Sequence, residues 1–254
     1  MRILLTNDDG INAAGLKVLQ EIAAKLSDDV WVVAPDSNQS GAAHSLTLQE
    51  PLRCSEIAPK TYSVKGTPTD CVIMGVRHIL KDDPPALILS GVNHGSNLGE
   101  DITYSGTVAG AMEGTLLGIP SIALSLTFEG DKNGDAYWDT PLAFGPQVIQ
   151  KILDADVPDN TLFNINFPPL APNQVQETTL TIQGRRDQNL LHIDERADTW
   201  GLPYYWFGFE RRRSNPPEGT DLWAMYSGRI SVTPLTLDLT NHEAARNLSG
   251  IFSE

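Results

Sequence analysis

The chain has 254 residues, of which 41% are hydrophobic, and this is enough for a large buried core. It carries 32 acidic and 18 basic side chains, a net charge of −14, which argues against the broad basic face that binding of a nucleic-acid polymer requires. A small phosphorylated ligand held through a cation remains compatible with this charge.

The sequence also indicates a compartment. Cys54 and Cys71 have neither Cys-x-x-Cys spacing nor histidines at zinc-finger distance, so we expect reduced, fairly buried thiols. The apolar run at the start of the chain stops at two aspartates, too early for a signal peptide, and no run approaches the about 18 apolar residues of a membrane span. We therefore expect a cytoplasmic protein that does not bind membranes.

The first residues predict a strand, a turn and a helix. Residues 2–6 fit a buried strand that ends at Asp8 and Asp9, and an apolar stripe at helical spacing follows in residues 16–26. Such a strand places its carboxylates at the carboxyl edge of an open α/β sheet, where these sheets bind ligands. A divalent cation would relieve the repulsion between the two charges, although a solvated turn with an N-cap aspartate explains the same residues.

A second apolar run, residues 30–34, predicts a neighbouring buried parallel strand. It ends in the loop 35–41, which is dense in hydroxyl and amide side chains and includes Ser40 and Gly41. We expect this loop to offer oxygen ligands and N–H groups to a metal and a phosphate at the same sheet edge. An ordinary surface loop fits its composition as well.

Further strands and a helix follow the same plan. Residues 44–65 alternate weakly and suggest a hairpin, and residues 66–70 begin a helix. A third buried strand, residues 86–90, runs into a loop of glycines and side-chain amides that contains Asn93 and Asn97. Polar groups thus follow another predicted strand end.

Ser105, Gly106 and Thr107 precede a helix expected over residues 108–117. Its unpaired N–H groups and dipole would favour an anion, and a plain Ser/Thr cap is the alternative. A fourth strand follows at residues 120–126. This alternation predicts a doubly wound, mostly parallel α/β sheet with right-handed crossovers.

The second half of the chain gives weaker signals. We expect a helix at residues 141–153 and strands at 161–167 and 229–234. The whole chain is interpreted as a single domain, with an α/β metal-binding core in residues 1–127. Residues 128–254 would complete the sheet and add an arm and a C-terminal segment.

Residues 175–235 are β-prone and rich in aromatic side chains. Exposed aromatics at this density are unfavourable unless covered, which predicts a protruding β arm that packs on another subunit. A small internal core beneath a long loop is the alternative. The basic clusters Arg185-Arg186 and Arg211-Arg212-Arg213 are expected to be solvated or paired.

Side-chain oxygens therefore follow three predicted strands: Asp8 with Asp9, Ser40, and Asn93 with Asn97. They are hard ligands, with no thiolate and no dependable imidazole among them. Such a set prefers Mg²⁺, Mn²⁺ or Ca²⁺ over a structural zinc ion.

Other chemistries lack their signatures. The sequence has no Gly-x-Gly-x-x-Gly after the first strand, no P-loop and no Gly-x-Ser-x-Gly elbow, and the isolated His94 is interpreted as a bystander. Metal-assisted hydrolysis of a phosphate ester remains. A metal-dependent nucleotide-binding module without turnover would share every ligand. An aspartyl-phosphate enzyme would usually show Asp-x-Asp at the strand end instead of adjacent aspartates.

Four motifs stand in order between residue 1 and about residue 126, and a weaker echo follows in Thr220-Asp221 and in residues 231–235. They are Asn7-Asp8-Asp9-Gly10, Pro35-Asp36 with Ser40-Gly41, Ser90-Gly91-Val92-Asn93-His94-Gly95-Ser96-Asn97 and Tyr104-Ser105-Gly106-Thr107. Together they resemble the SurE family of 5′/3′-nucleotidases (survival protein E).

The resemblance implies a divalent-metal phosphomonoesterase that acts on nucleoside 5′- and 3′-monophosphates and on short-chain polyphosphate. It implies one Mg²⁺ or Mn²⁺ ion per subunit, with these ligands: Asp8, Asp9, Ser40 and Asn93. The implied substrate contacts are Ser40, Gly41, Asn97, Ser105, Gly106 and Thr107. The implied catalytic residues are Asp8, Asp9 and Asn97, with one aspartate orienting or deprotonating the attacking water. It also implies a homodimer or homotetramer that exchanges the C-terminal arm.

Overall fold

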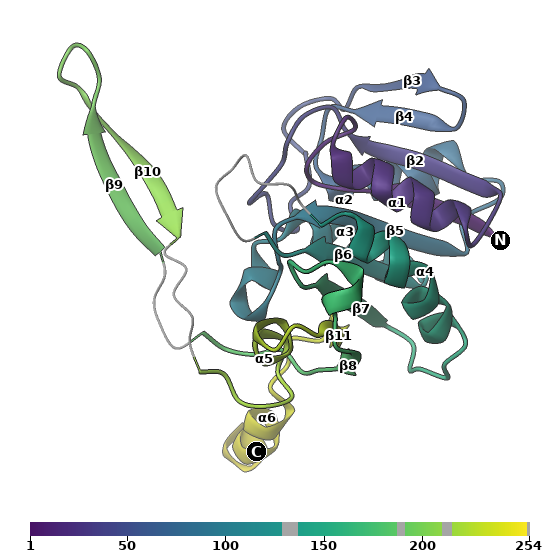
Figure 1. Ribbon diagram of the computed structural model, residues 1–254. Coiled ribbons are helices and arrows are strands. Elements are labelled where there is room, and N and C mark those ends of the chain that lie inside the picture. The colour runs from purple at the N-terminus through teal and green to yellow at the C-terminus, as the bar shows by residue number, and fades with distance from the viewer. Residues whose placement is uncertain (129–136, 187–190, 210–214, 253–254) are drawn as a thin grey trace.

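The computed structural model describes residues 1–128, 137–186, 191–209 and 215–252, so the cluster Arg211-Arg212-Arg213 lies outside the described residues. Figure 1 shows the arrangement of the helices and strands. In chain order they are β1 (Arg2–Thr6), α1 (Ala14–Ala24), β2 (Asp29–Pro35), β3 (Cys54–Ala58), β4 (Thr61–Val64), α2 (Pro68–Met74), the π-helix η1 (Gly75–Ile79), β5 (Leu87–His94), the 3₁₀ helix η2 (Gly99–Thr103), α3 (Gly106–Leu116), β6 (Ser121–Leu126), α4 (Asp139–Leu153), β7 (Thr161–Phe167), the 3₁₀ helix η3 (Pro172–Gln174), β8 (Thr178–Leu180), β9 (Leu191–Ala197), β10 (Pro203–Phe209), α5 (Asp221–Tyr226), β11 (Ile230–Thr236) and α6 (His242–Phe252).

Nine strands of the described chain form one sheet in the order β3-β4-β2-β1-β5-β6-β7-β11-β8. The pairs from β4 to β7 are parallel, and antiparallel pairing occurs where β3 meets β4 and where β11 meets β7. Helices cover both faces of the sheet. The predicted doubly wound, mostly parallel α/β fold is confirmed, and the carboxyl ends of β2, β1 and β5 meet at one edge.

The two faces have separate apolar cores. Helices α1 and α4 pack on one face, where Leu16, Leu19 and Ile22 of α1 are fully buried among strand residues such as Leu5 and Leu89. Helices α2 and α3 cover the other face. The central parallel strands β1, β5 and β6 are therefore buried on both sides, which explains why they read as continuous apolar runs in the sequence.

Strand β5 is longer than predicted and carries the site residues. The sequence predicts its end at Ser90, but the strand continues to His94, with an irregular register against β6 between Ser90 and Asn93. Gly91 has φ +139°, and a Cβ there would lie 2.2 Å from the main-chain oxygen of Leu124, so only glycine fits. Such a bulge re-aims the side chains that follow it.

In the second half, the predicted helix and the two predicted strands correspond to α4, β7 and β11. The short helix α5 was not predicted; it has six residues and begins at its N-cap Thr220, whose side chain accepts the N–H of Trp223. Helix α6 was not predicted either, and its side chains lie exposed. Helix α5 is shorter than two helical turns, which is too short to show a period in the sequence.

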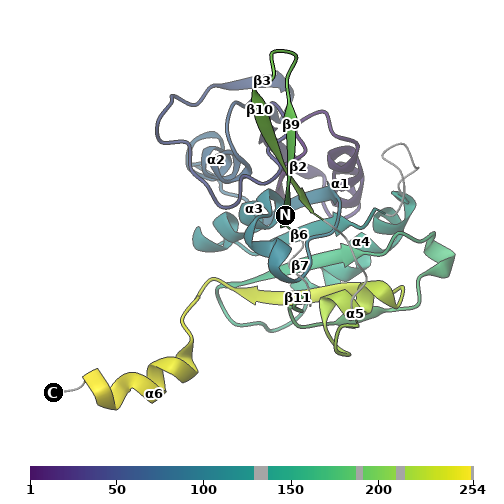
Figure 2. The same cartoon turned by 90° about the vertical axis from the view of Figure 1, so that its left-hand side faces the viewer.

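The aromatic segment folds as a hairpin of its own, β9 paired antiparallel with β10. Figure 1 shows it protruding from the sheet, and Figure 2 shows α6 protruding separately near the C-terminus. Trp206 is 59% exposed and Phe207 74% exposed. The aromatics therefore do not form an internal core, and the protruding arm is confirmed.

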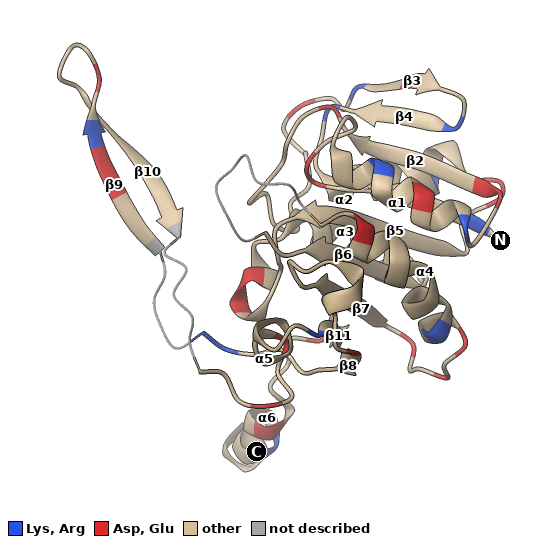
Figure 3. Cartoon of the chain, viewed as in Figure 1, with Lys and Arg blue, Asp and Glu red and all other residues tan. Residues whose placement is uncertain are grey.

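The charged residues are interspersed, as Figure 3 shows, with single lysines and arginines among acidic residues on the labelled elements. In the described part of the chain, no helix is both long enough and apolar enough to cross a membrane. The described thiols Cys54 and Cys71 are both free; Cys71 is buried and Cys54 partly buried, and burial raises the pKa of each.

Candidate functional site

The carboxyl ends of the parallel strands enclose a cavity of about 270 Å³. It is lined by loops that follow β2, β1 and β5 and by the start of α3, because parallel strands end at the same edge. Six of the residues predicted from the sequence line it together: Asp8, Ser40, Gly41, Asn93, Asn97 and Ser105.

Asp8 is only 4% exposed and lies against the first turn of α3. One carboxylate oxygen accepts the hydroxyl of Thr107, and Thr107 is itself fully buried. Burial raises the pKa of Asp8 to about 6; the Thr107 hydroxyl opposes this shift and the charge of Asp9 adds to it. Burial makes this carboxylate costly to ionise, which favours a cation beside it.

Asp9 lies next to this cavity and connects two strand ends. Its carboxylate oxygen Oδ2 accepts the main-chain N–H of His94 at 3.0 Å, so the turn after β1 is tied to the end of β5. The side chain is partly buried. The two adjacent aspartates therefore have different surroundings: Asp8 faces α3, and Asp9 faces β5.

The loop after β2 is anchored to the same turn. The N–H of Gln39 donates to the main-chain oxygen of Asp8 at 2.7 Å, and the N–H of Ser40 donates to the side chain of Asn38 at 2.8 Å. Gly41 has φ +78°, the left-handed region that favours glycine. These bonds place the exposed Ser40 and Gly41 at the cavity.

The start of α3 completes the cavity wall. Ser105 is the N-cap, and its hydroxyl oxygen accepts the N–H of Val108 at 3.0 Å, which is the plain cap that the sequence analysis gave as the alternative to an anion site. A Cβ at Gly106 would lie 2.8 Å from the Cβ of Asp8, so glycine allows the helix to approach the carboxylate. Thr107 directs its hydroxyl to Asp8 and is not part of the lining.

Asn97 is held by a buried polar network that the sequence analysis missed. Its side chain donates to the Ser125 hydroxyl at 2.8 Å, and its main-chain oxygen accepts the side chains of Asn164 and Asn166 at 2.8 and 3.1 Å. The sequence did contain a signal for this network, because asparagines inside a buried strand such as β7 require hydrogen-bond partners. Asn93 donates to the main-chain oxygen of Gly95 at 2.9 Å, and this contact shapes the same loop.

Six further residues line the cavity but were not assigned to it from the sequence: His94, Gly95, Ser96, Asp101, Tyr104 and Arg186. The ring of His94 packs against Phe128, with the ring centroids 4.6 Å apart, so it is part of the wall instead of a distant bystander. Arg186 follows β8, far along the chain, and no local pattern connects it with this edge.

The donor set fits a hard divalent cation. It consists of two carboxylates, a hydroxyl and an amide, all oxygen ligands. Within the described ranges, no group of three or more His, Cys, Asp or Glu side chains could hold a metal, which leaves zinc-type clusters without support. The buried Asp8 beside Asp9 supplies the negative charge that such an ion would neutralise.

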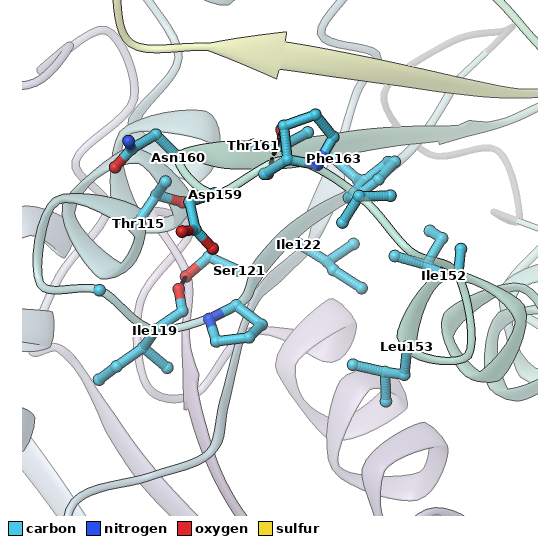
Figure 4. A pocket seen from close by; sticks show the side chains of 15 residues that line it. Thr115, Ile119, Ser121, Ile122, Ile152, Leu153, Asp159, Asn160, Thr161 and Phe163 are labelled. Carbon is cyan, nitrogen blue, oxygen red and sulfur yellow. Dashed lines mark hydrogen bonds between the residues drawn. The ribbon is translucent and has the colours of Figure 1, made fainter.

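A larger cavity of about 560 Å³ lies at the opposite edge, where β6 and β7 begin. Figure 4 shows polar side chains, among them Thr115 and Ser121, on one side and apolar ones such as Ile152 on the other. Both hydroxyls donate to nearby main-chain oxygens, at 2.9 and 2.8 Å, and the lining carries one carboxylate, Asp159. The smaller cavity is therefore the better candidate for chemistry.

Comparisons with known proteins agree with this geometry. A sequence model of the family described as survival protein SurE matches residues 3–190. The protein from Parvibaculum lavamentivorans named 5′-nucleotidase SurE is 55% identical over 249 residues, covering 98% of this chain and 90% of the relative. Its namesake from Rhodopseudomonas palustris (strain BisB18) is 58% identical over 243 residues, covering 95% of each chain.

The fold agrees as well. The crystal structure of the SurE protein from Aquifex aeolicus superposes with a TM-score of 0.85 at 43% sequence identity, and the match covers 100% of both chains. Since a family model spans most of the sequence and relatives match nearly its full length, this chain belongs to the SurE family.

Proposed function

We propose that this chain is a divalent-metal-dependent phosphomonoesterase that hydrolyses nucleoside 5′- and 3′-monophosphates to nucleoside and phosphate, and also short-chain polyphosphate. The observation that carries the proposal is the buried carboxylate of Asp8, placed beside Asp9 and at the start of α3 in a cavity lined by oxygen ligands. The relatives named 5′-nucleotidase SurE support the reaction class.

The metal site would be formed by Asp8, Asp9, Ser40 and Asn93, with Mg²⁺ or Mn²⁺ as the ion. An ion bound there would neutralise the charge of the phosphate oxygens and polarise a water molecule. Three neighbouring strand ends bring Asp8, Ser40 and Asn93 to one cavity, which supports this assignment.

Protein groups would bind the anion, orient Asp8 and activate the attacking water. The first turn of α3, from Ser105 to Thr107, presents a helix N-terminus to the anion, and Asn97 is held rigidly at the cavity wall by its buried partners. The Thr107 hydroxyl fixes the orientation of Asp8. One of the two aspartates orients or deprotonates the attacking water.

The decisive experiment measures phosphate release from AMP and GMP. We expect turnover with Mg²⁺ or Mn²⁺ and none with EDTA, and loss of most activity in Asp9→Asn while the circular dichroism spectrum stays native. Full activity in this variant contradicts its role. Nucleotide binding without phosphate release at long times would instead show a binding module, and a trapped phospho-enzyme would show an aspartyl-phosphate mechanism.

We also propose that the chain assembles as a homodimer or homotetramer through the C-terminal arm, because Trp206 and Phe207 on β10 and Ile251 on α6 are largely exposed. Light scattering should give an oligomer for the wild-type chain and a smaller species after Trp206→Ser with Phe207→Ser. A monomeric wild-type protein at micromolar concentration contradicts this. The two free thiols favour a cytoplasmic protein.

A further inference from the structure

Arg186 is the only arginine or lysine that lines the 270 Å³ cavity in the described part of the chain. Its side chain is 15% exposed, whereas that of its neighbour Arg185 is 93% exposed. The charged groups around it in the cavity wall, Asp8 and Asp101, are acidic. Among the described residues, the wall therefore contains one positive charge, and the fold has brought it there from a distant part of the sequence.

The position of Arg186 is set by contacts with η2, the 3₁₀ helix that leads into Ser105. Its guanidinium Nη2 pairs with the carboxylate of Asp101, and its main-chain N–H donates to the carboxylate of Glu100 at 3.0 Å. The Gln183 side chain adds a 3.0 Å hydrogen bond to the main-chain oxygen of Gly99. The charge of Arg186 is thereby held beside the start of α3.

A second set of hydrogen bonds connects the same two segments, the one just before Arg186 and the one at η2. The carboxylate of Asp221 accepts the N–H groups of Gly99 and Gly184, each at 2.8 Å, and that of Leu222 at 2.7 Å. Asp221 is fully buried. Asp221 of the Thr220-Asp221 motif thus joins the segment just before Arg186, at Gly184, to the start of η2, at Gly99, which gives the motif a structural role.

The protein leaves part of the guanidinium unsatisfied. Asp101 pairs with Nη2, and Nε is buried without a hydrogen-bond partner. A guanidinium has five N–H donors, and its planar fork matches the oxygens of a phosphate. An arginine anchored at one corner by a carboxylate and short of acceptors is suited to binding an anion.

We propose that Arg186 binds the phosphate group of the substrate, together with the start of α3. The proposal rests on the proposed phosphomonoesterase function. The carboxylates of the wall repel a phosphate dianion, and Arg186 adds to the proposed metal ion a fixed positive charge that belongs to the protein itself.

Titration calorimetry with inorganic phosphate, in the presence of Mg²⁺, tests the proposal. We expect the dissociation constant to rise about ten- to a hundredfold in Arg186→Gln, since a charge-assisted hydrogen bond is lost. The matched control Arg185→Gln removes the same charge one residue away and should bind within about twofold of wild type. Unchanged phosphate binding in Arg186→Gln overturns the proposal, as does a wild-type protein that binds no phosphate at millimolar concentration.

Arg186→Lys covers the case in which the glutamine variant fails to fold, because it keeps the charge beside Asp101 but loses the planar fork. It should bind phosphate more weakly than wild type, and equal binding overturns the assignment. Adenosine serves as a second probe: if Arg186→Gln weakens adenosine binding and leaves phosphate binding intact, Arg186 contacts the nucleoside and the proposal is wrong. A wild-type protein that binds phosphate but releases none from AMP refutes the phosphomonoesterase function and leaves the role of Arg186 standing.

Discussion

Replacing Asp8 with asparagine should stabilise the metal-free protein while removing its activity. The carboxylate is almost completely buried, next to a second acidic residue. Asparagine keeps the shape and can still accept the Thr107 hydroxyl, but it carries no charge. Asp8 is thus expected to be an active-site residue that lowers the stability of the fold, so that its replacement raises stability and removes activity.

The size of the effect follows from the pKa. Burial raises the pKa of Asp8 from 3.8 to about 6 in the folded protein, and one pKa unit corresponds to about 1.4 kcal/mol. Above pH 6 the ionised group therefore lowers the free energy of unfolding of the metal-free protein by about 3 kcal/mol at most. This penalty decreases as the pH falls through 6 and is absent below pH 3.8. The amide makes a weaker hydrogen bond with Thr107, and its new N–H groups need partners, which offsets about 1–2 kcal/mol.

We therefore expect Asp8→Asn to raise the free energy of unfolding by about 1–2 kcal/mol at pH 8 with EDTA, and the gain to vanish or reverse at pH 4. Urea denaturation followed by circular dichroism measures both values. Saturating Mg²⁺ should stabilise the wild-type protein and not the variant, since only the wild type binds the ion tightly. Asp9→Asn is the matched control, because it removes the same charge from a partly buried carboxylate that accepts the N–H of His94. A destabilised Asp8→Asn at pH 8, or a gain independent of pH, would refute the reasoning.

Three more substitutions test other parts of the structure. Gly106→Ala introduces a Cβ 2.8 Å from the Cβ of Asp8. Activity and Mg²⁺ affinity should therefore fall at least about tenfold, while the melting temperature changes little. Normal Mg²⁺ affinity in calorimetry would show that this close approach does not matter for the site. Asp29 accepts hydrogen bonds from Lys60 and Arg2, which lower its pKa to about 2, and its side chain is about one-third exposed. Asp29→Asn should therefore lower the free energy of unfolding by about 1 kcal/mol at pH 7. Urea denaturation should show this difference above pH 3.8 and its loss as the pH falls towards 2. Asp221→Asn replaces a buried acceptor of three main-chain N–H groups and should lower the free energy of unfolding by about 2–4 kcal/mol, and a loss below about 1 kcal/mol in the same assay would show that the segments it joins are held by other contacts.

Local chemistry was enough to predict much of this molecule. Burial on one or both faces determines which residues are apolar in β1, β2, β5 and β6 and in the stripe of α1. These runs and the helical spacing of the stripe are therefore visible in a short window of the sequence. The convergence of Asp8, Ser40 and Asn93 could be inferred as well, because parallel strands in a doubly wound sheet end at the same edge.

The partners of these residues depend on contacts between distant segments. Asn166 lies 69 residues from Asn97, and Arg186 lies 85 residues from Asp101, so neither pairing leaves a trace in local composition. The irregular register in β5, which carries its strand past Ser90, likewise reflects a close approach of Gly91 to β6.

By itself, the sequence determined the alternation of strands and helices, the polar strand ends and an aromatic segment that would not fit a core. Only the tertiary structure decided that Thr107 donates a hydrogen bond to Asp8, that Asn97 is held by a network from β6 and β7, and that Arg186, from beyond β8, faces the cavity. The physical reason is that burial and hydrogen-bonding preferences act on neighbouring residues, whereas side-chain partnerships across the sheet exist only after the strands have been ordered.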